Sequence, residues 1–214
     1  MFRSFIIAVL VWITFASPAF ADALHLNPSQ MPGARSLEEF GQTTMPVGYY
    51  EFCRRYREQC DRPAGREMVE LTEDRWRALV EVNWIANTIV APRTDQQIFG
   101  VEERWDYPTN VGDCEDYVLL KRKLLAERGF PLGALRITVG LDAEGGGHAV
   151  LTVVTDLGDF VLDNVEQEIK RWDQAEIQYL KWQSGDDLNS WVSLVNPVVA
   201  ARQQAGGGST ARLR

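Results

Sequence analysis

Midway along the sequence the spacing of apolar residues changes from helical to alternating. In residues 114–128 apolar side chains recur every three or four positions, which is typical of a helix, and Gly129 then stops it. Residues 135–141 alternate apolar with other side chains, as a half-buried strand does, and residues 148–155 and 160–163 continue this pattern after short turns. A helix followed by an antiparallel meander is an α+β pattern, so we expect a helix packed on an antiparallel sheet.

The rest of the chain predicts fewer elements. A second helix is expected over residues 72–90, because Thr72 can cap it and apolar side chains recur along it. Residues 91–111 show no period and are expected to form a long connection, which in a compact domain is usually functional. Residues 178–182 and 190–195 are expected to add strands to the sheet.

The N-terminal residues have the composition of a secretory signal peptide. Arg3 precedes an apolar run over residues 5–15, and small residues at Ala19 and Ala21 form an A-x-A cleavage pattern. The run is too short to span a bilayer comfortably, so a retained membrane anchor is the weaker interpretation. We therefore expect a signal peptide over residues 1–21 and a mature protein that is periplasmic or secreted.

Charge and length limit the partners and the domain organisation. The full chain has a net charge of −8, and the expected signal peptide removes one positive charge, so the mature chain is more acidic still. An acidic chain without a long basic stripe does not suit a nucleic acid. No other apolar stretch is long enough to cross a membrane. Length favours one domain, expected over residues 22–200, and the Gly-, Gln- and Arg-rich residues 201–214 are expected to be a disordered tail.

The chain has three cysteines, and an odd number leaves one thiol over in an oxidising compartment. Cys53 and Cys60 are close in sequence, whereas Cys114 lies far downstream, so we expect a disulfide between the first two. In a continuous helix, residues seven apart are separated by about 10.5 Å of rise, beyond the ~7 Å limit between bridged Cα atoms. A bridge therefore requires a bend between them. The alternative is two free thiols on a short helix.

Cys114 lies in the motif Gly-Asp-Cys-Glu-Asp-Tyr at residues 112–117, in the first turn of the expected helix. The unpaired backbone N–H groups and the positive helix end favour a thiolate there, which is the nucleophilic form of cysteine. The neighbouring carboxylates oppose it, because negative charges raise the pKa of a thiol. The alternative is that the acids only complement the helix dipole and that Cys114 is an inert core residue.

Two further residues complete a candidate catalytic set. His148 begins an expected strand after a Gly-rich turn, where it can act as a general base, whereas His25 near the mature N-terminus is set aside as solvated. Asp163 ends the next strand, and an antiparallel return brings it toward the start of its neighbour. Cys114 would then be the nucleophile, His148 the proton acceptor and donor, and Asp163 the residue that orients the imidazole.

Spacing alone does not bring this set together. With a two-residue turn at Leu157-Gly158, Asp163 lies opposite Thr152, about 13 Å along the strand from His148. The triad needs a bulge or a different register. The alternatives are a solvent-exposed histidine at a strand end and an aspartate that only initiates a turn.

Three segments together resemble the bacterial transglutaminase-like cysteine proteinases. They are the motif at residues 112–117, His-Ala-Val-Leu-Thr at residues 148–152 and Val-Leu-Asp-Asn at residues 161–164. Trp-Asp-Tyr-Pro at residues 105–108 belongs to the same resemblance, which covers roughly residues 70–173. The resemblance implies a papain-like or transglutaminase-like α+β fold, with the nucleophile at a helix N-terminus, and the triad named above.

The resemblance also implies an activity. The family's LapG-type branch consists of periplasmic, calcium-dependent proteases that cleave biofilm adhesins, which implies a protein substrate such as a surface adhesin and a membrane protein as regulator. The cysteine pair lies outside the matched motifs. Between residues 98 and 113 there is no glutamine to complete a papain-style oxyanion hole, so the backbone N–H of Cys114 and a donor from residues 105–110 would have to serve.

The acids around the cysteine are expected to bind Ca²⁺ through Asp113 and Glu115. Calcium takes six to eight oxygen ligands, and carbonyl groups of residues 105–112 with water would complete the shell. A bound dication would neutralise the charges that oppose thiolate formation. Asp116 is left out of the set because it can face away or cap the helix. The alternative is that these acids only complement the helix dipole.

The sequence thus leads to an exported cysteine endopeptidase that works through a thioester acyl-enzyme. One rival is a transglutaminase or other acyl transferase that uses the same triad, because water and an amine attack the same thioester. The other rival is a calcium-binding module whose cysteine is idle.

Overall fold

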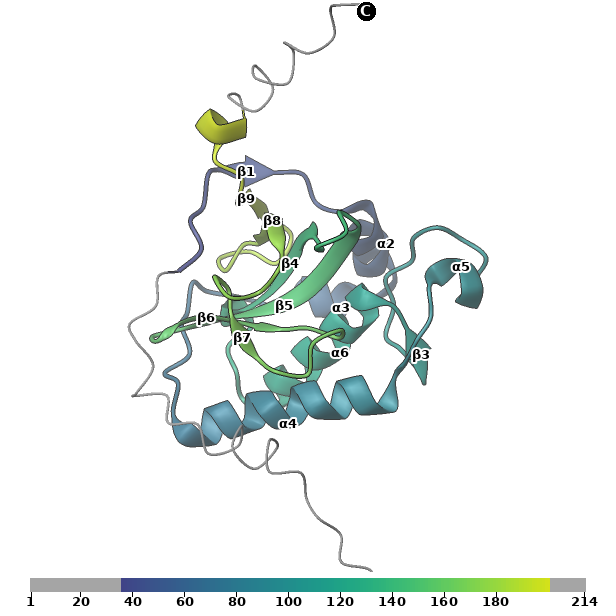
Figure 1. The fold of residues 1–214 in the computed structure, drawn as a ribbon, viewed down its shortest axis with the longest axis horizontal. Coiled ribbons are helices and arrows are strands. Elements are labelled where there is room, and N and C mark those ends of the chain that lie inside the picture. The colour runs from purple at the N-terminus through teal and green to yellow at the C-terminus, as the bar shows by residue number, and fades with distance from the viewer. Residues whose placement is uncertain (1–35, 201–214) are drawn as a thin grey trace, which may run out of the picture.

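The computed structural model describes residues 36–200 of the chain, so the expected signal peptide and C-terminal tail lie outside the described residues. Its centre is a seven-stranded antiparallel sheet in the order β1-β9-β8-β4-β5-β6-β7 (Figure 1). The long central strands are β4 (Leu135–Leu141) and β5 (Gly147–Thr155), which lie where the alternating pattern predicts strands. The expectation of a half-buried strand is wrong for β4, because successive residues on both of its faces are buried. The remaining strands of this sheet are β1 (Gln42–Thr43), β6 (Gly158–Leu162), β7 (Lys170–Arg171), β8 (Gln178–Gln183) and β9 (Trp191–Ser193).

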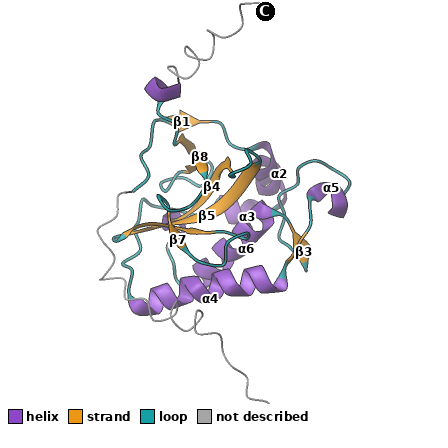
Figure 2. Cartoon of the chain, in the orientation of Figure 1, coloured by secondary structure: helices purple, strands orange, loops and turns teal. Residues whose placement is uncertain are grey.

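Two long helices pack in layers against the sheet. Helix α6 (Cys114–Glu127) lies against β5 and β4, and α4 (Glu73–Ile89) packs on α6 (Figure 2). The first turn of α4 is capped as predicted, because Thr72 Oγ1 accepts the backbone N–H of Arg75 at 3.3 Å. The predicted α+β class, with the cysteine at a helix start packed on an antiparallel sheet, is confirmed. Within the described residues no helix has the length and hydropathy needed to span a bilayer.

The end of α6 follows from Gly129. This glycine has a φ of +82°, which costs a residue without a side chain little. The chain there closes with two backbone hydrogen bonds, from Gly129 to Ala126 at 3.0 Å and from Phe130 to Leu125 at 3.1 Å. This is the 6→1 and 5→2 pattern of a Schellman motif, and it buries Phe130 against the core. The C-terminal end of α6 is therefore closed, whereas Asp113 at its N-cap makes no side-chain capping hydrogen bond.

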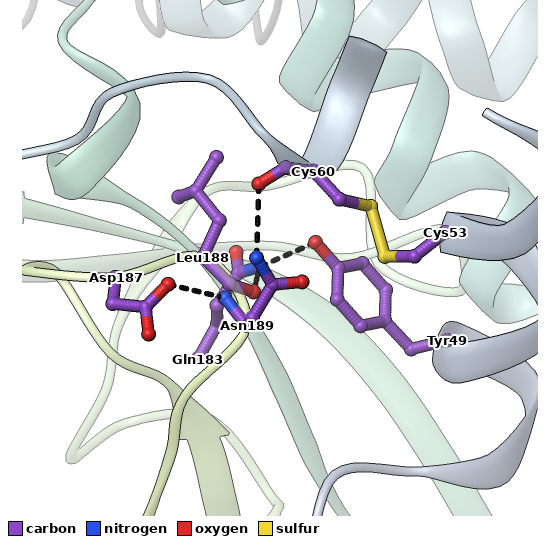
Figure 3. The surroundings of a disulfide bond; sticks show 7 residues. All are labelled: Tyr49, Cys53, Cys60, Gln183, Asp187, Leu188 and Asn189. Atoms are coloured by element: carbon purple, nitrogen blue, oxygen red, sulfur yellow. Dashed lines mark hydrogen bonds between the residues drawn. A yellow bond between two sulfur atoms is a disulfide. The ribbon is translucent and has the colours of Figure 1, made fainter. Parts of the chain in front are cut away.

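The predicted disulfide is present and the predicted bend accompanies it. Cys53 and Cys60 are bridged with their Cα atoms 5.6 Å apart. The helical structure is interrupted at Tyr56, between α2 (Val47–Arg55) and α3 (Arg57–Cys60). Figure 3 shows how this corner is attached to the sheet: Asn189 donates from Nδ2 to the carbonyl oxygen of Cys60 at 3.2 Å. Gln183 of β8 also donates to the hydroxyl of Tyr49 at 2.6 Å.

Residues 91–111 contain more structure than a plain connection. A two-stranded parallel sheet joins β2 (Ala91–Pro92) to β3 (Val111–Gly112), and the short helix α5 (Asp95–Ile98) lies between them in sequence. Gly112 is needed here, because a Cβ atom at this position would lie 2.8 Å from the side chain of Asp116. Because β3 lies directly before α6, the pairing of β2 with β3 places α5 near the N-terminus of α6. A single 3₁₀ turn, η2 (Leu132–Ala134), precedes β4.

Candidate active site

Cys114 is the first residue of α6, as predicted, and is the free cysteine among the described residues. Its thiol donates to Glu115 Oε2 at 3.1 Å. Burial raises the pKa of Cys114 far above its ordinary value, and the negative charges of Glu115 and Asp113 raise it further. Burial and the flanking acids, which raise the pKa of the thiol, therefore outweigh the helix start, which lowers it. This balance holds as long as no positive charge neutralises the acids.

His148 and Asp163 face each other across two neighbouring strands. The Nε2 atom of His148 lies 2.9 Å from Asp163 Oδ1, and both side chains are mostly buried. With Nε2 engaged, the ring presents Nδ1 as its other proton-exchanging atom. Cys114 begins the helix that packs on β5, and the backbone N–H of Ala149, the residue that follows His148, lowers the pKa of its thiol. The structure thus joins His148 to Asp163 directly and places Cys114 on the helix that packs against the strand of His148.

The register explains how this pair forms. The predicted turn at Leu157-Gly158 is wrong by one residue: Thr155 pairs with Gly158, so the turn is Asp156-Leu157. Leu151 then pairs with Leu162, and Asp163 falls one residue further on, diagonal to His148 on the neighbouring strand. Diagonal neighbours lie within reach of side chains of this length. The different register that the triad needs is the one observed.

Several groups hold Asp163 in place. Its Oδ1 also accepts the backbone N–H of Val165 at 3.0 Å, and Asn87 of α4 donates from Nδ2 to its carbonyl oxygen at 2.9 Å. Burial would raise the pKa of Asp163, but the hydrogen bond and charge of His148, the Val165 N–H and the nearby Lys121 together lower it below its ordinary value. Asp163 is therefore an anion that can stabilise a protonated His148.

A second cluster includes Asp113, the residue that precedes Cys114. Carboxylate oxygens of Asp95, Asp113 and Asp116 lie within 4.8 Å of one another. The N–H of Asp95 donates to Asp113 Oδ2 at 3.1 Å, and the N–H of Asp106 donates to Asp116 Oδ1 at 2.8 Å. Asp95 and Asp113 each keep one buried carboxylate oxygen without a hydrogen-bond partner among the described residues. These oxygens are free to bind a cation.

The charges of this cluster are only partly offset by a neighbouring cation, because Arg104 lowers the pKa of Asp95 but burial and repulsion outweigh it. Burial, and then repulsion from Asp113, raise the pKa of Asp95 to about 6. Burial is also the main cause that raises the pKa of Asp116 to about 8, with repulsion from Asp113 and Asp95 adding to it. Acids that resist ionisation in this way gain most from a bound cation.

Of the two predicted calcium ligands, Asp113 is one of the three clustered carboxylates. The carboxylate of Glu115 accepts a hydrogen bond from the thiol of Cys114 and also interacts with the side chain of Asp113, and burial followed by repulsion from Asp113 raises the pKa of Glu115 to about 8. Sequence reasoning missed Asp95 and left out Asp116. The one local signal near Asp95 was Thr94, which caps α5. The sequence could not show that Asp95 approaches Asp113, because this approach depends on the pairing of β2 with β3.

A cavity of about 250 Å³ adjoins the pair formed by His148 and Asp163. Its lining is rich in carboxylates and contains one lysine, Lys170, which is paired with Glu166 at 3.1 Å. The acidic lining residues besides Asp163 are Asp142, Glu144, Glu166, Glu168 and Glu176. The imidazole is therefore reachable from an open, negatively charged hollow.

Comparison with known proteins gives one extensive match. The model of the family described as bacterial transglutaminase-like cysteine proteinase matches residues 39–198. Calcium-bound LapG of Legionella pneumophila is 20% identical, covers 68% of this chain and 88% of that chain, and has a TM-score of 0.47. A second LapG structure from the same organism is also 20% identical, covers 62% of this chain and 86% of that chain, and has a TM-score of 0.44. The EGTA-treated form is 24% identical, covers 51% and 72%, and has a TM-score of 0.41. No curated protein is similar to the chain at a significant level.

Proposed function

Because the chain belongs to the bacterial transglutaminase-like cysteine proteinases, we propose that it is a cysteine endopeptidase whose catalytic triad is Cys114, His148 and Asp163. The observation that carries the proposal is the hydrogen bond of 2.9 Å between His148 and Asp163, with Cys114 on the helix that packs against the strand of His148. We place the enzyme in the periplasm or outside the cell. The disulfide supports that location, since such bonds persist in oxidising compartments.

The chemistry follows from these three side chains. His148 takes the thiol proton on Nδ1 while Asp163 accepts the hydrogen bond from Nε2 and stabilises the imidazolium. The sulfur attacks the peptide carbonyl, and the backbone N–H of Cys114 donates to the oxygen that becomes negative. The C–N bond then breaks as the imidazolium gives its proton to the leaving amine. Water, deprotonated by the imidazole, attacks the thioester, releases the acid and restores the thiol.

The acidic cluster fits a calcium ion. It offers oxygen ligands only, in a buried group of three carboxylates with two unpaired oxygens, and hard oxygen ligands are those that calcium prefers. We propose Asp95, Asp113 and Asp116 as ligands, with Glu115 next to the sulfur in an outer position. The bound ion would supply positive charge beside Cys114, which lowers the pKa of the thiol.

By the family resemblance we further propose a surface adhesin as substrate and a membrane protein as regulator.

Alkylation of Cys114 by iodoacetamide at about pH 5.5 tests the assignment, because an idle cysteine stays protonated there and an activated one reacts. The disulfide removes the other two cysteines from the reaction. We expect the calcium-loaded protein to react about tenfold or more faster than its His148→Ala variant, and faster than the chelated protein. Equal rates in the parent and the variant would overturn the triad.

The same preparation separates hydrolysis from acyl transfer. Incubation with an amine donor and a glutamine-containing protein should give no covalent amine product if water is the natural acceptor. Such a product, lost in Cys114→Ala, would replace the peptidase assignment with that of an acyl transferase.

A further inference from the structure

The bend between α2 and α3 holds the segment that leads to the acidic cluster. Arg55 is the last residue of α2, and its Nη2 donates to the carbonyl oxygen of Trp105 at 2.5 Å. Tyr56, the next residue, donates from its hydroxyl to Asp106 Oδ1 at 2.6 Å. Two consecutive residues of the bend therefore hold two consecutive residues that lie 50 positions further along the chain.

Asp106 connects the bend to the acidic cluster. Its carboxylate also accepts the backbone N–H of Tyr107 at 2.9 Å and is paired with Arg104 at 3.2 Å, so its position is fixed from several sides. Its own backbone N–H donates to Oδ1 of Asp116 at 2.8 Å. Asp116 is one of the three clustered carboxylates that we propose as calcium ligands. A hydrogen bond of this kind orients a carboxylate that binds a metal.

The disulfide encloses Tyr56. It joins Cys53 of α2 to Cys60 of α3, and Tyr56 lies between them with a non-helical backbone, at φ −123° and ψ 58°. A helix of four residues, such as α3, is not stable by its own hydrogen bonds, so the bridge helps to hold α3 against α2. Without the bridge, the backbone of Tyr56 would regain freedom and its hydroxyl would no longer be fixed beside Asp106.

The ring and the hydroxyl of Tyr56 make separate contacts. The ring packs on Phe52 and Tyr107, with centroids 4.9 and 5.4 Å away. Phenylalanine would make the same aromatic contacts. Packing therefore accounts for the ring, whereas the bond to Asp106 accounts for the hydroxyl.

We propose that Tyr56 is a positioning residue of the calcium site, and that the disulfide, by fixing Tyr56, makes the calcium affinity of the protein depend on its redox state. The inference rests on the calcium site of the proposed function and does not depend on turnover. A dithiol reductant would give two electrons and two protons to the bridge, which becomes the two thiols of Cys53 and Cys60, while the reductant becomes a disulfide. Asp116 then loses the support that reaches it through Asp106.

Titration calorimetry with calcium tests the proposal in the full chain. We expect Tyr56→Phe to weaken calcium binding about tenfold, because the loss of an outer partner of a metal ligand commonly has an effect of this size. Tyr50→Phe is the matched control, because Tyr50 lies on α2 and is exposed. It should bind calcium as the parent does.

The contribution of the bridge is measured in the same way. Reduction by dithiothreitol, or the double substitution Cys53→Ser with Cys60→Ser, should weaken calcium binding by a similar factor. Either change should add little in Tyr56→Phe, because the support through the hydroxyl is already absent there. Losses of affinity that simply add would overturn the link between the bridge and Tyr56.

The midpoint of thermal unfolding separates positioning from a structural role. A residue that only stabilises the fold would lower the midpoint equally in calcium and in EGTA, whereas loss of a positioning residue narrows the gap between the two conditions. An unchanged calcium affinity in folded Tyr56→Phe would overturn the proposal, and so would a parent protein that binds no calcium. Weaker calcium binding in Tyr56→Phe together with failure of the iodoacetamide test would retain this inference and reject the peptidase.

Discussion

At the scale of single residues, the ionised state of Asp163 has a consequence for stability. An acid whose pKa is lower in the folded protein stabilises the fold above its unfolded pKa of about 4 and loses that contribution as the pH falls through the folded pKa. We expect Asp163→Asn to lower the free energy of unfolding by about 1 kcal/mol near pH 6, because a charge-assisted hydrogen bond becomes a neutral one. The difference should shrink below about pH 4.

Urea unfolding from about pH 3 to 6 measures this difference, with the exposed Asp61→Asn as the matched control. A loss of stability that stays constant over the whole range would contradict the assignment of Asp163 as the ionised partner. Asp163→Asn should also be less harmful to activity than His148→Ala, because the amide oxygen can still accept the hydrogen bond from Nε2.

The same residues show what could be predicted from sequence. The motif around Cys114, together with His148 and Asp163, was sufficient to name the candidate triad, because nucleophile and base were each placed at the start of a predicted element. The register was not predictable from the turn residues alone. Thr155 Oγ1 accepts the N–H of Leu157 at 3.1 Å and donates to the carbonyl of Gly158 at 2.6 Å, which holds the turn one residue earlier. Leu71, far away in sequence, also donates to Asp156 at 2.8 Å.

At the scale of elements, the disulfide between α2 and α3 supports a segment that lies outside the two helices it joins. The bend that it closes presents the hydroxyl of Tyr56, which donates to Asp106 Oδ1 at 2.6 Å. The N–H of Asp106 in turn donates to Asp116 in the acidic cluster. The corner therefore supports the segment that borders the proposed calcium site. This chain of contacts could not be predicted, because residues 91–111 carry no period that reveals β2, α5 and β3.

We expect removal of the bridge by Cys53→Ser with Cys60→Ser to lower the free energy of unfolding by about 2 kcal/mol, because the unfolded chain regains the freedom of a short loop. Urea unfolding with and without a reductant measures the effect. The parent should respond to the reductant, and the double variant should not. Cys114→Ser is the control that should respond as the parent does, since its bridge is intact.

At the scale of the whole molecule, the acidic cluster links stability to both pH and calcium. Asp95 and Asp116, with pKa values raised by burial to about 6 and about 8, bind more protons in the folded than in the unfolded protein between about pH 4 and 8. The stability of the chelated protein should therefore fall as the pH rises through this window. Calcium binds the deprotonated acids, so its stabilising effect should grow over the same range.

The midpoint of thermal unfolding, measured with calcium or EGTA from about pH 5 to 8, checks this expectation. The gap between the two conditions should widen with pH. Asp95→Asn should abolish the gap, whereas Glu115→Gln should retain it, which separates the cluster in the structure from the ligand pair expected from the sequence. A gap that is absent at every pH would reject the calcium site.

The pairing of β1 with β9 determines how the fold begins to unfold under a pulling force. The two strands meet at one edge of the sheet with Gln42 opposite Val192, so the chain leaves both of them at the same end of their antiparallel ladder (Figure 1). A pull on the chain outside β1 and β9 would therefore open this pair rung by rung, as a zipper opens, instead of shearing all its bonds together. β5 and β6, which position His148 and Asp163, lie toward the opposite edge of the sheet. Under a pulling force, β1 and β9 would therefore separate before the force reached the strands of the candidate site.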